Sequence, residues 1–300
     1  MRLQFVQNLI DTLRGKAAVA RGLPVTVDNV ASNHIDPLFD RFASAEFTFN
    51  GATRRWLTNV NADRGVTEQT LSLLCEAFPT GREQVKVLNI GCGKKDQMAF
   101  LQALGFDAYG VDYDIDEDTD RIKFHDLNTG DDLPFPADTF DCVVCQEIIE
   151  HIENPWLLFR KIKRLLKVGG TLVVTTPNIS SLQSRKKFAN NAIGFFAYFD
   201  AANLWQHINP IPYWEMVHIA TFNGFASVSL SGNNEYYVRY VPKKPDPRGT
   251  GRRDATLQNN DVLHYVFRNL DRDIKVYSPV PTYNNDRTAA AQGRDGATPS

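Results

Sequence analysis

The chain has no apolar run of the roughly 20 residues that a membrane-spanning helix needs. Asp11 and Arg14 interrupt the apolar part of its N-terminal stretch, so we expect no secretory signal there. Net charge is also scarce, at −2 over 300 residues, and no overall field draws the chain to nucleic acid or to an anionic membrane. These absences predict a cytoplasmic protein without a membrane span and argue against nucleic acid as a partner.

Cysteine is scarce as well, with four residues: Cys75, Cys92, Cys142 and Cys145. The last two form a C-x-x-C inside TFDCVVCQ, which is typical of a buried strand. Side chains alternate between the two faces of a strand, so Cys142 and Cys145 point in opposite directions and cannot share one metal ion. We expect free, buried thiols in a reducing compartment.

What the chain does contain is enough apolar material for a core, with 43% hydrophobic and 11% aromatic residues. The stretch from Val85 to Asp112 predicts a strand, a Gly-Cys-Gly turn, a helix and a second strand that ends on an acid. Glycines allow a ligand to approach the backbone, and a strand-ending carboxylate can hold ribose hydroxyls. The stretch therefore indicates a ligand that carries adenosine.

Strands and helices alternate from this point on. Strands are predicted at 85–90, 107–112, 122–125, 139–146 and 171–176, and helices at 66–78, 96–104, 154–166 and 211–223. Such alternation predicts a parallel sheet with helices on both faces.

The rest of the chain is organised around this α/β unit. We expect an N-terminal helical addition over 1–80, one α/β domain over 81–280 with a lid insertion at about 180–210, and a disordered tail over 281–300. The lid region is rich in aromatic residues. The segments 236–241 and 262–267 are both strand-like, and the sequence leaves open which of them joins the sheet.

Four motifs in order resemble class I S-adenosylmethionine-dependent methyltransferases: VLNIGCG, GVD, LPFPADTFDCVVCQEIIEHIENP and KVGGTLVVTTPN. Within this family, the chain is similar to small-molecule, glycan-pathway and ubiquinone-pathway O-methyltransferases. The resemblance implies a doubly wound, mostly parallel, seven-stranded Rossmann-like sheet and S-adenosylmethionine as the cofactor.

The resemblance also implies which residues bind the cofactor. The glycine turn would lie under its methionine and ribose parts, Asp112 would accept from the ribose hydroxyls, and Asp126 would meet the adenine. The full set is Asn89, Gly91, Cys92, Gly93, Asp112, Tyr113, Asp126, Leu127 and Gln146. Two positions depart from the family pattern: Asn89 stands where an acid is usual, and Lys95 where a small residue is common.

The catalytic candidates lie in and after Glu147-Ile-Ile-Glu150-His151. If 147–151 forms a helical turn, its two acids and its histidine share one face, and His207 could complete a site for Mg²⁺ or another divalent metal. The sequence also allows Glu150 and His151 to cap the start of the next helix without any metal, and this interpretation is the favoured one. In that case His207 is a candidate general base or a packing residue.

The sequence therefore predicts an S-adenosylmethionine-dependent methyltransferase that acts on a small-molecule or glycan-type acceptor, through oxygen. Two alternatives remain: a non-catalytic binding module with the same fold, and an RNA or nucleotide methyltransferase. The sequence pI of about 6.3 and the lack of a basic stripe count against the nucleic-acid alternative.

Overall fold

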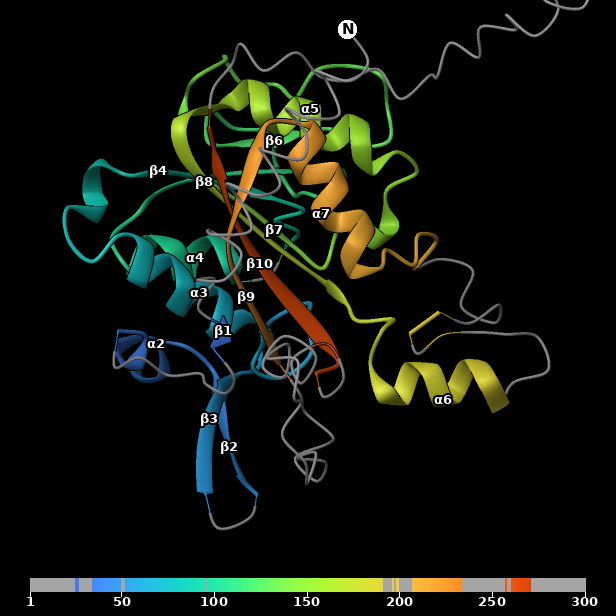
Figure 1. The fold of residues 1–300 in the computed structure, drawn as a ribbon. Helices are drawn as coiled ribbons and strands as arrows, with labels where there is room; N and C mark the ends of the chain where they lie inside the picture. The colour runs from blue at the N-terminus through green and yellow to red at the C-terminus, as the bar shows by residue number, and fades with distance from the viewer. Residues whose placement is uncertain are drawn as a thin grey trace, which may run out of the picture.

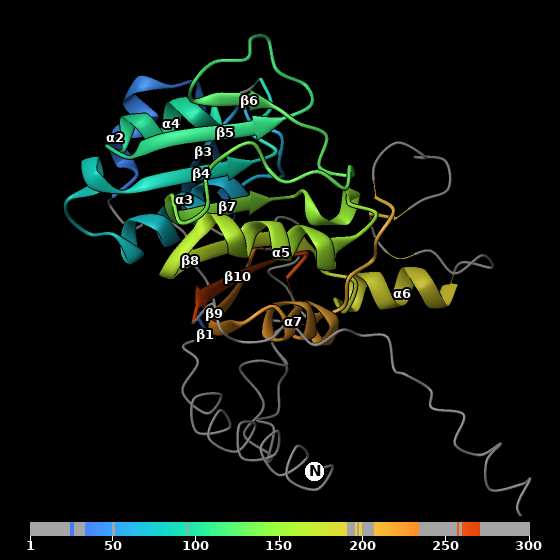
Figure 2. The same cartoon turned by 90° about the horizontal axis from the view of Figure 1, so that it is seen from above.

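The computed structural model describes residues 25–26, 34–49, 52–94, 96–190, 196, 198–199, 207–233, 257 and 260–270. Their centre is an eight-stranded sheet in the order β1-β9-β10-β8-β7-β4-β5-β6 (Figures 1 and 2). Its strands are β1 (Val25–Thr26), β4 (Lys86–Ile90), β5 (Asp107–Asp112), β6 (Ile122–Phe124), β7 (Phe140–Gln146), β8 (Leu166–Pro177), β9 (Phe225–Asn233) and β10 (Val262–Asn269).

The strand order reverses at β4. The chain runs from β4 to β5 and β6 on one side, then crosses to β7 and β8 on the other, and these five strands are all parallel. β10 pairs antiparallel with both β8 and β9. Apart from the two-residue β1, the sheet has the seven mostly parallel strands that the sequence predicted. Doubly wound sheets bind ligands where the order reverses, here at the carboxyl ends of β4 and β7.

Two helical layers cover the sheet, as predicted. The helices α5 (Pro155–Leu165) and α7 (Tyr213–Phe222) pack on one face. The other face carries α2 (Asp36–Arg41), α3 (Val66–Ala77) and α4 (Gln97–Ala103). Strand side chains alternate between these layers, and Cys142 and Cys145 lie in opposite core clusters. All four cysteines are free and buried, as expected.

The segment that was predicted to form strand 262–267 is β10, which lies between β8 and β9. Its rival, 236–241, lies outside the described residues, as does the tail 281–300. The helix predicted at 154–166 is α5, which begins after Asn154, whose side chain accepts a hydrogen bond from the Leu157 amide at 2.9 Å. Asparagine is a favoured cap because it satisfies a backbone N–H that the first turn leaves unpaired.

The N-terminal part differs from the expectation of helices and loops. Between α2 and α3 it forms an antiparallel hairpin of β2 (Ser44–Phe49) and β3 (Ala52–Leu57), which extends away from the sheet in Figure 1. The sequence between these strands is Asn-Gly, a hairpin signal that the helical interpretation overlooked.

The lid region begins with α6 (Leu182–Asn190), which lies outside the two layers in both views. Short 3₁₀ turns complete the described elements at η1 (Arg82–Gln84) and η2 (Ile149–His151). No described helix is both long enough and apolar enough to cross a membrane.

Candidate active site

The glycine turn follows β4 and is fixed to the neighbouring strand. Gly91 has a φ of +75°, and a Cβ on it would lie 2.0 Å from Cδ1 of Ile148. Its amide donates to the Val111 carbonyl on β5 at 2.8 Å. Gly93 also has a positive φ, of +54°. The turn therefore needs glycine at both positions, for conformation and, at Gly91, for space.

Asp112 ends β5 beside this turn and is 8% exposed. Its Oδ2 accepts from the Gly93 amide at 2.8 Å, and its Oδ1 accepts from the Asp114 amide at 2.9 Å. Each carboxylate oxygen keeps a further lone pair, so the group can still accept from hydroxyls of a ribose. The arrangement fits the role that the resemblance implies.

The adenine-side candidates are more open. Tyr113 is 70% exposed. Asp126 is also exposed and accepts from the Asn128 amide at 2.9 Å, which closes a local turn. Leu127 packs against the core cluster of the α5 face. Their contact with the cofactor remains a prediction.

Three other candidates point into the protein. The Asn89 amide nitrogen donates to Gln97 of α4 at 3.0 Å, and Asn89 is 2% exposed. Gln146 likewise donates to Thr67 of α3 at 3.0 Å. Burial raises the pKa of the Cys92 thiol to about 12, so this cysteine stays protonated and serves in packing.

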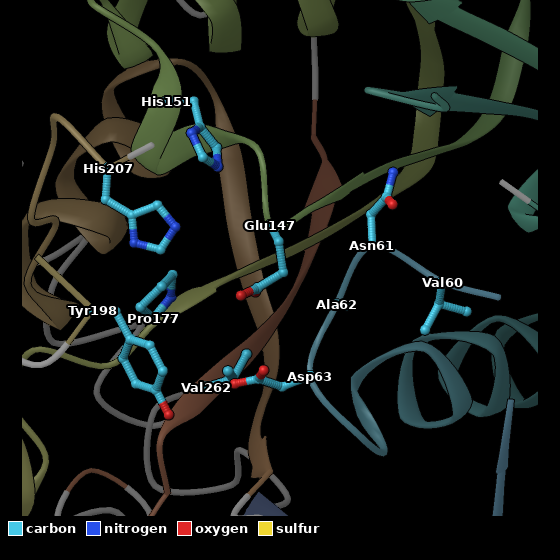
Figure 3. A pocket seen from close by; sticks show the side chains of 10 residues that line it. All are labelled: Val60, Asn61, Ala62, Asp63, Glu147, His151, Pro177, Tyr198, His207 and Val262. Carbon is cyan, nitrogen blue, oxygen red and sulfur yellow. The ribbon is translucent and has the colours of Figure 1, made fainter. Parts of the chain in front are cut away.

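A cavity of about 470 Å³ opens at the carboxyl ends of β7 and β8 (Figure 3). Its lining comes from five parts of the chain: the segment before α3, the loop after β7, the end of β8, the region around His207 and the start of β10. The lining residues are Val60, Asn61, Ala62, Asp63, Glu147, His151, Pro177, Tyr198, His207 and Val262. The cavity therefore lies beside β7, one of the two strands at whose carboxyl ends a sheet with this strand order is expected to bind ligands.

Glu147 begins the loop after β7 with a left-handed φ of +51°. Figure 3 shows its side chain directed into the cavity. The Thr175 hydroxyl donates to its Oε1 at 2.7 Å. Burial, and further the negative charge of Asp63, raise the pKa of Glu147 to about 7, against the hydrogen bond from Thr175.

Glu150, His151 and His207 bring three possible metal-ligand atoms within 4.8 Å of one another. Glu150 Oε1 lies 3.9 Å from His151 Nε2 and 4.0 Å from His207 Nε2. Glu150 is fully buried, and Oε1 has no hydrogen-bond partner among the described residues. Burial and the charge of Glu147 raise the pKa of Glu150 well above its ordinary value. A cation at this point would offset the cost of that buried carboxylate.

Residues 147–151 do not form the single helical turn that the sequence suggested. Only Ile149–His151 are helical, as a 3₁₀ turn, and the left-handed Glu147 precedes it. A 3₁₀ turn has three residues per turn, and its i and i+4 positions are not aligned as in an α-helix. As a result Glu147 stands outside the three-residue cluster.

His207 is held near Glu150 and His151 by hydrogen bonds of the two residues that follow it. The amides of Ile208 and Asn209 both donate to the Glu150 carbonyl at 2.9 Å. The Asn209 side chain also donates to the Ile152 carbonyl. The rings of His151 and His207 meet edge to face at 4.8 Å. Burial and the nearby His151 lower the pKa of His207 to about 4, so its imidazole is neutral at pH 7.

Sequence reasoning missed the segment just before α3. Asn61 and Asp63 belong to no recognised motif, and a polar Asn-x-Asp before a helix is also typical of an ordinary loop. Only the folded chain brings them across from Glu147.

Comparison with known proteins gives a family match. The family model described as "Methyltransferase domain" matches residues 62–230, more than half of the chain. The ubiquinone biosynthesis O-methyltransferase of Proteus mirabilis (strain HI4320) is 29% identical over 104 residues, which cover 31% of this chain and 42% of the relative. The mitochondrial ubiquinone biosynthesis O-methyltransferase of Rattus norvegicus is 30% identical over 111 residues, 33% of this chain and 32% of the relative. The chain thus aligns with less than half the length of these curated relatives.

Among solved structures, an S-adenosylmethionine-dependent methyltransferase from Archaeoglobus fulgidus has a TM-score of 0.46 at 18% identity. The alignment covers 67% of this chain and 94% of that one. This likeness is too low to support an argument about function.

Proposed function

Because the chain belongs to the methyltransferase-domain family and is an enzyme that uses S-adenosylmethionine, we propose that it methylates a hydroxyl oxygen of a small-molecule or glycan-type acceptor. The observation that carries the proposal is the group Glu150, His151 and His207 beside the cavity at the ends of β7 and β8. The two curated relatives described above are O-methyltransferases, which supports oxygen as the acceptor atom.

The cofactor supplies an activated methyl group on a sulfonium. The protein must then align the acceptor and remove its proton, because a neutral hydroxyl is a weak nucleophile. The glycine turn follows β4 and is hydrogen-bonded to Asp112 at the end of β5, and Glu147 follows the neighbouring strand β7. An acceptor in the cavity would meet the carboxylate of Glu147 directly (Figure 3).

We assign the proton-accepting role to Glu147 rather than to His207. A general base works best when its pKa is near the working pH, and Glu147 has a pKa of about 7. His207, with a pKa of about 4, is a weaker base. A neutral imidazole is, however, the form that binds a metal ion.

A divalent metal fits the other three residues. Glu150 would hold it through the unpartnered Oε1, with His151 and His207 as nitrogen ligands. When bound, it would lower the pKa of the acceptor hydroxyl. One carboxylate and two imidazoles suit Mn²⁺, Fe²⁺ or Zn²⁺ better than Mg²⁺, which prefers oxygen ligands.

The charge of the cavity favours a small neutral acceptor over RNA. Asp63 and Glu147 line it, and no lysine or arginine is among its described lining residues. A nucleic-acid site would need basic side chains to meet phosphates.

Methyl transfer from radiolabelled cofactor tests the proposal. Panels of neutral phenols and catechols, simple glycosides and RNA are offered after metal removal, with Mn²⁺, Zn²⁺ or Mg²⁺ then returned. We expect label in a neutral hydroxyl acceptor, loss of transfer in excess EDTA, and recovery with Mn²⁺ or Zn²⁺. Glu150→Gln and His207→Ala should lose transfer, whereas His218→Ala, an exposed histidine on α7, should keep it.

Each part of the proposal can fail separately. Undiminished transfer in excess EDTA would rule out the metal while leaving the acceptor class intact. Transfer to RNA alone, or to a nitrogen of the acceptor, would overturn the acceptor class.

A further inference from the structure

The segment 59–63 connects the glycine turn with the cavity. On one side, the Asp96 amide at the start of α4 donates to the Asn59 carbonyl at 3.4 Å. A Cβ placed on Gly93 would lie 3.0 Å from the side-chain nitrogen Nδ2 of Asn61. On the other side, Asn61 and Asp63 line the cavity together with Glu147 (Figure 3). The segment thus lies beside the turn after β4 and lines the cavity together with the residue that follows β7.

The cofactor has two groups of opposite charge at its amino-acid end, a carboxylate and an ammonium. The ammonium needs a carboxylate or several carbonyl oxygens around it when water is displaced. If Asp112 on β5 held the ribose and the sulfonium faced the cavity, the amino-acid end would lie near the glycine turn and segment 59–63. The partner of the ammonium should therefore come from the turn, from its strand or from this segment.

The nearby alternatives are already engaged or uncharged. Asp112 accepts from two backbone amides and lies on the ribose side. Asn89 has no charge, is buried, and directs its amide nitrogen to Gln97. The methionine end therefore lacks a carboxylate from β4 itself.

Asp63 has the properties that the ammonium requires. Figure 3 shows its carboxylate at the cavity wall, which also carries Glu147. Asp63 is an exposed residue, and a partial loss of solvation at its carboxylate raises its pKa despite the adjacent Arg64. A cation beside it would compensate for that loss of solvation.

We propose that Asp63 binds the α-ammonium group of S-adenosylmethionine and supplies the negative charge that Asn89 does not. The inference concerns the cofactor only and does not depend on the identity of the acceptor or on a metal. A residue from the segment before α3 would thus complete a cofactor site whose other parts come from β4 and β5.

Calorimetry with two ligands separates this role from a general effect on the fold. S-adenosylhomocysteine carries the amino-acid end, whereas 5′-methylthioadenosine has the same adenosine and sulfur without it. For Asp63→Asn we expect S-adenosylhomocysteine to bind about 10- to 100-fold more weakly, as for the loss of one charged hydrogen bond, and 5′-methylthioadenosine to bind as before. Asp63→Glu, which keeps the charge, should retain part of the affinity.

Two control variants fix the interpretation. Asp112→Asn should weaken both ligands, because both carry the ribose. Asp40→Asn, on α2 and outside the cavity lining, should weaken neither. Unchanged affinity of Asp63→Asn for S-adenosylhomocysteine, or an equal loss for both ligands, would overturn the proposal. Failure of the wild-type protein to bind S-adenosylhomocysteine would instead remove the cofactor assignment itself.

Discussion

The Gly93 amide donates a hydrogen bond to Oδ2 of Asp112 at 2.8 Å, joining the glycine turn after β4 to the acid that ends β5. The acid therefore orders the turn as well as offering oxygens to the ribose. Because Oδ1 is held in the same way by the Asp114 amide, the carboxylate has one orientation before any ligand arrives. Groups that are held in position lose little entropy on binding.

Asp112→Ala should accordingly abolish measurable cofactor affinity. It removes the ribose acceptor and leaves the Gly93 amide without its partner, so the loss exceeds that of a single charged hydrogen bond, about 1.5–3 kcal/mol. Titration with S-adenosylhomocysteine measures it. Asp114→Ala, which keeps the backbone donor, is the matched control and should bind within a few-fold of wild type. Equal losses in both variants would contradict the assignment.

The sequence predicted this part of the site because the signal is local. Each of these residues lies at the end of a strand: the glycines at 91 and 93 follow one strand, and the acid at 112 ends the next. The end of a strand can be predicted from the residues of that strand alone. The residues that the segment before α3 contributes to the cavity wall could not be predicted from the sequence in this way. Asp63 and Asn61 come to line the same cavity as Glu147 only after helix α3 has packed on the sheet, and nothing in their own spacing predicts this. Likewise, the sequence could not show that Glu147 would lie outside the cluster of Glu150, His151 and His207. The i, i+3, i+4 rule assumes an α-helix, whereas Glu147 has a left-handed backbone conformation and only Ile149–His151 form a 3₁₀ turn.

Gly91→Ala should destabilise the protein and weaken cofactor binding. A left-handed φ costs a non-glycine residue about 1–3 kcal/mol, and the new Cβ would meet the Ile148 side chain. In the Ile148→Ala background, Gly91→Ala should lower the free energy of unfolding by a smaller amount. The steric clash with Ile148 is then absent, and only the cost of the left-handed backbone remains. Urea denaturation of the four proteins gives both terms. Complete recovery would show that backbone strain is absent.

Asn209→Ala should weaken metal binding more than it weakens the fold. Asn209 connects the loop of His207 to the Ile152 carbonyl, and its loss frees His207 from Glu150 and His151. Partners that orient a metal ligand typically contribute 10- to 100-fold in affinity. Mn²⁺ titration followed by electron paramagnetic resonance measures it, with thermal unfolding of the metal-free variant as the control. Unchanged Mn²⁺ affinity would show that the two backbone bonds to the Glu150 carbonyl suffice.

Glu150→Gln should leave the metal-free protein as stable as wild type, or more stable. The buried carboxylate has an unpartnered oxygen and a raised pKa, so its ionised form destabilises the fold at neutral pH. Wild type should regain stability when Mn²⁺ is added, since a ligand that binds only the folded state stabilises it by mass action, whereas Glu150→Gln should not respond. Thermal unfolding with and without Mn²⁺ decides this. A large loss of stability in metal-free Glu150→Gln would show that the hydrogen bond from Thr176 matters more than the charge.

His264 should make the stability of the fold sensitive to pH below about 6.5. The side chain lies on β10, fully buried, with Nδ1 3.4 Å from the Thr70 hydroxyl of α3 and Nε2 without a partner among the described residues. Burial lowers the pKa of His264 to about 3. An unfolded histidine titrates near pH 6.5, so below that pH the unfolded state binds a proton that the native state refuses. The contribution of His264 to stability is therefore complete above pH 6.5 and declines, by at most about 1.4 kcal/mol per pH unit, until the native side chain protonates near pH 3.

His264→Leu should remove this dependence. Urea midpoints measured between pH 7 and pH 4 should fall less steeply in the variant than in wild type, whatever its stability at pH 7. His218→Leu replaces an exposed histidine and should keep the wild-type slope. The comparison of slopes isolates one titrating group, because every carboxylate is common to the three proteins. Parallel slopes for wild type and His264→Leu would mean that the native protein opens around β10 and accepts the proton without unfolding.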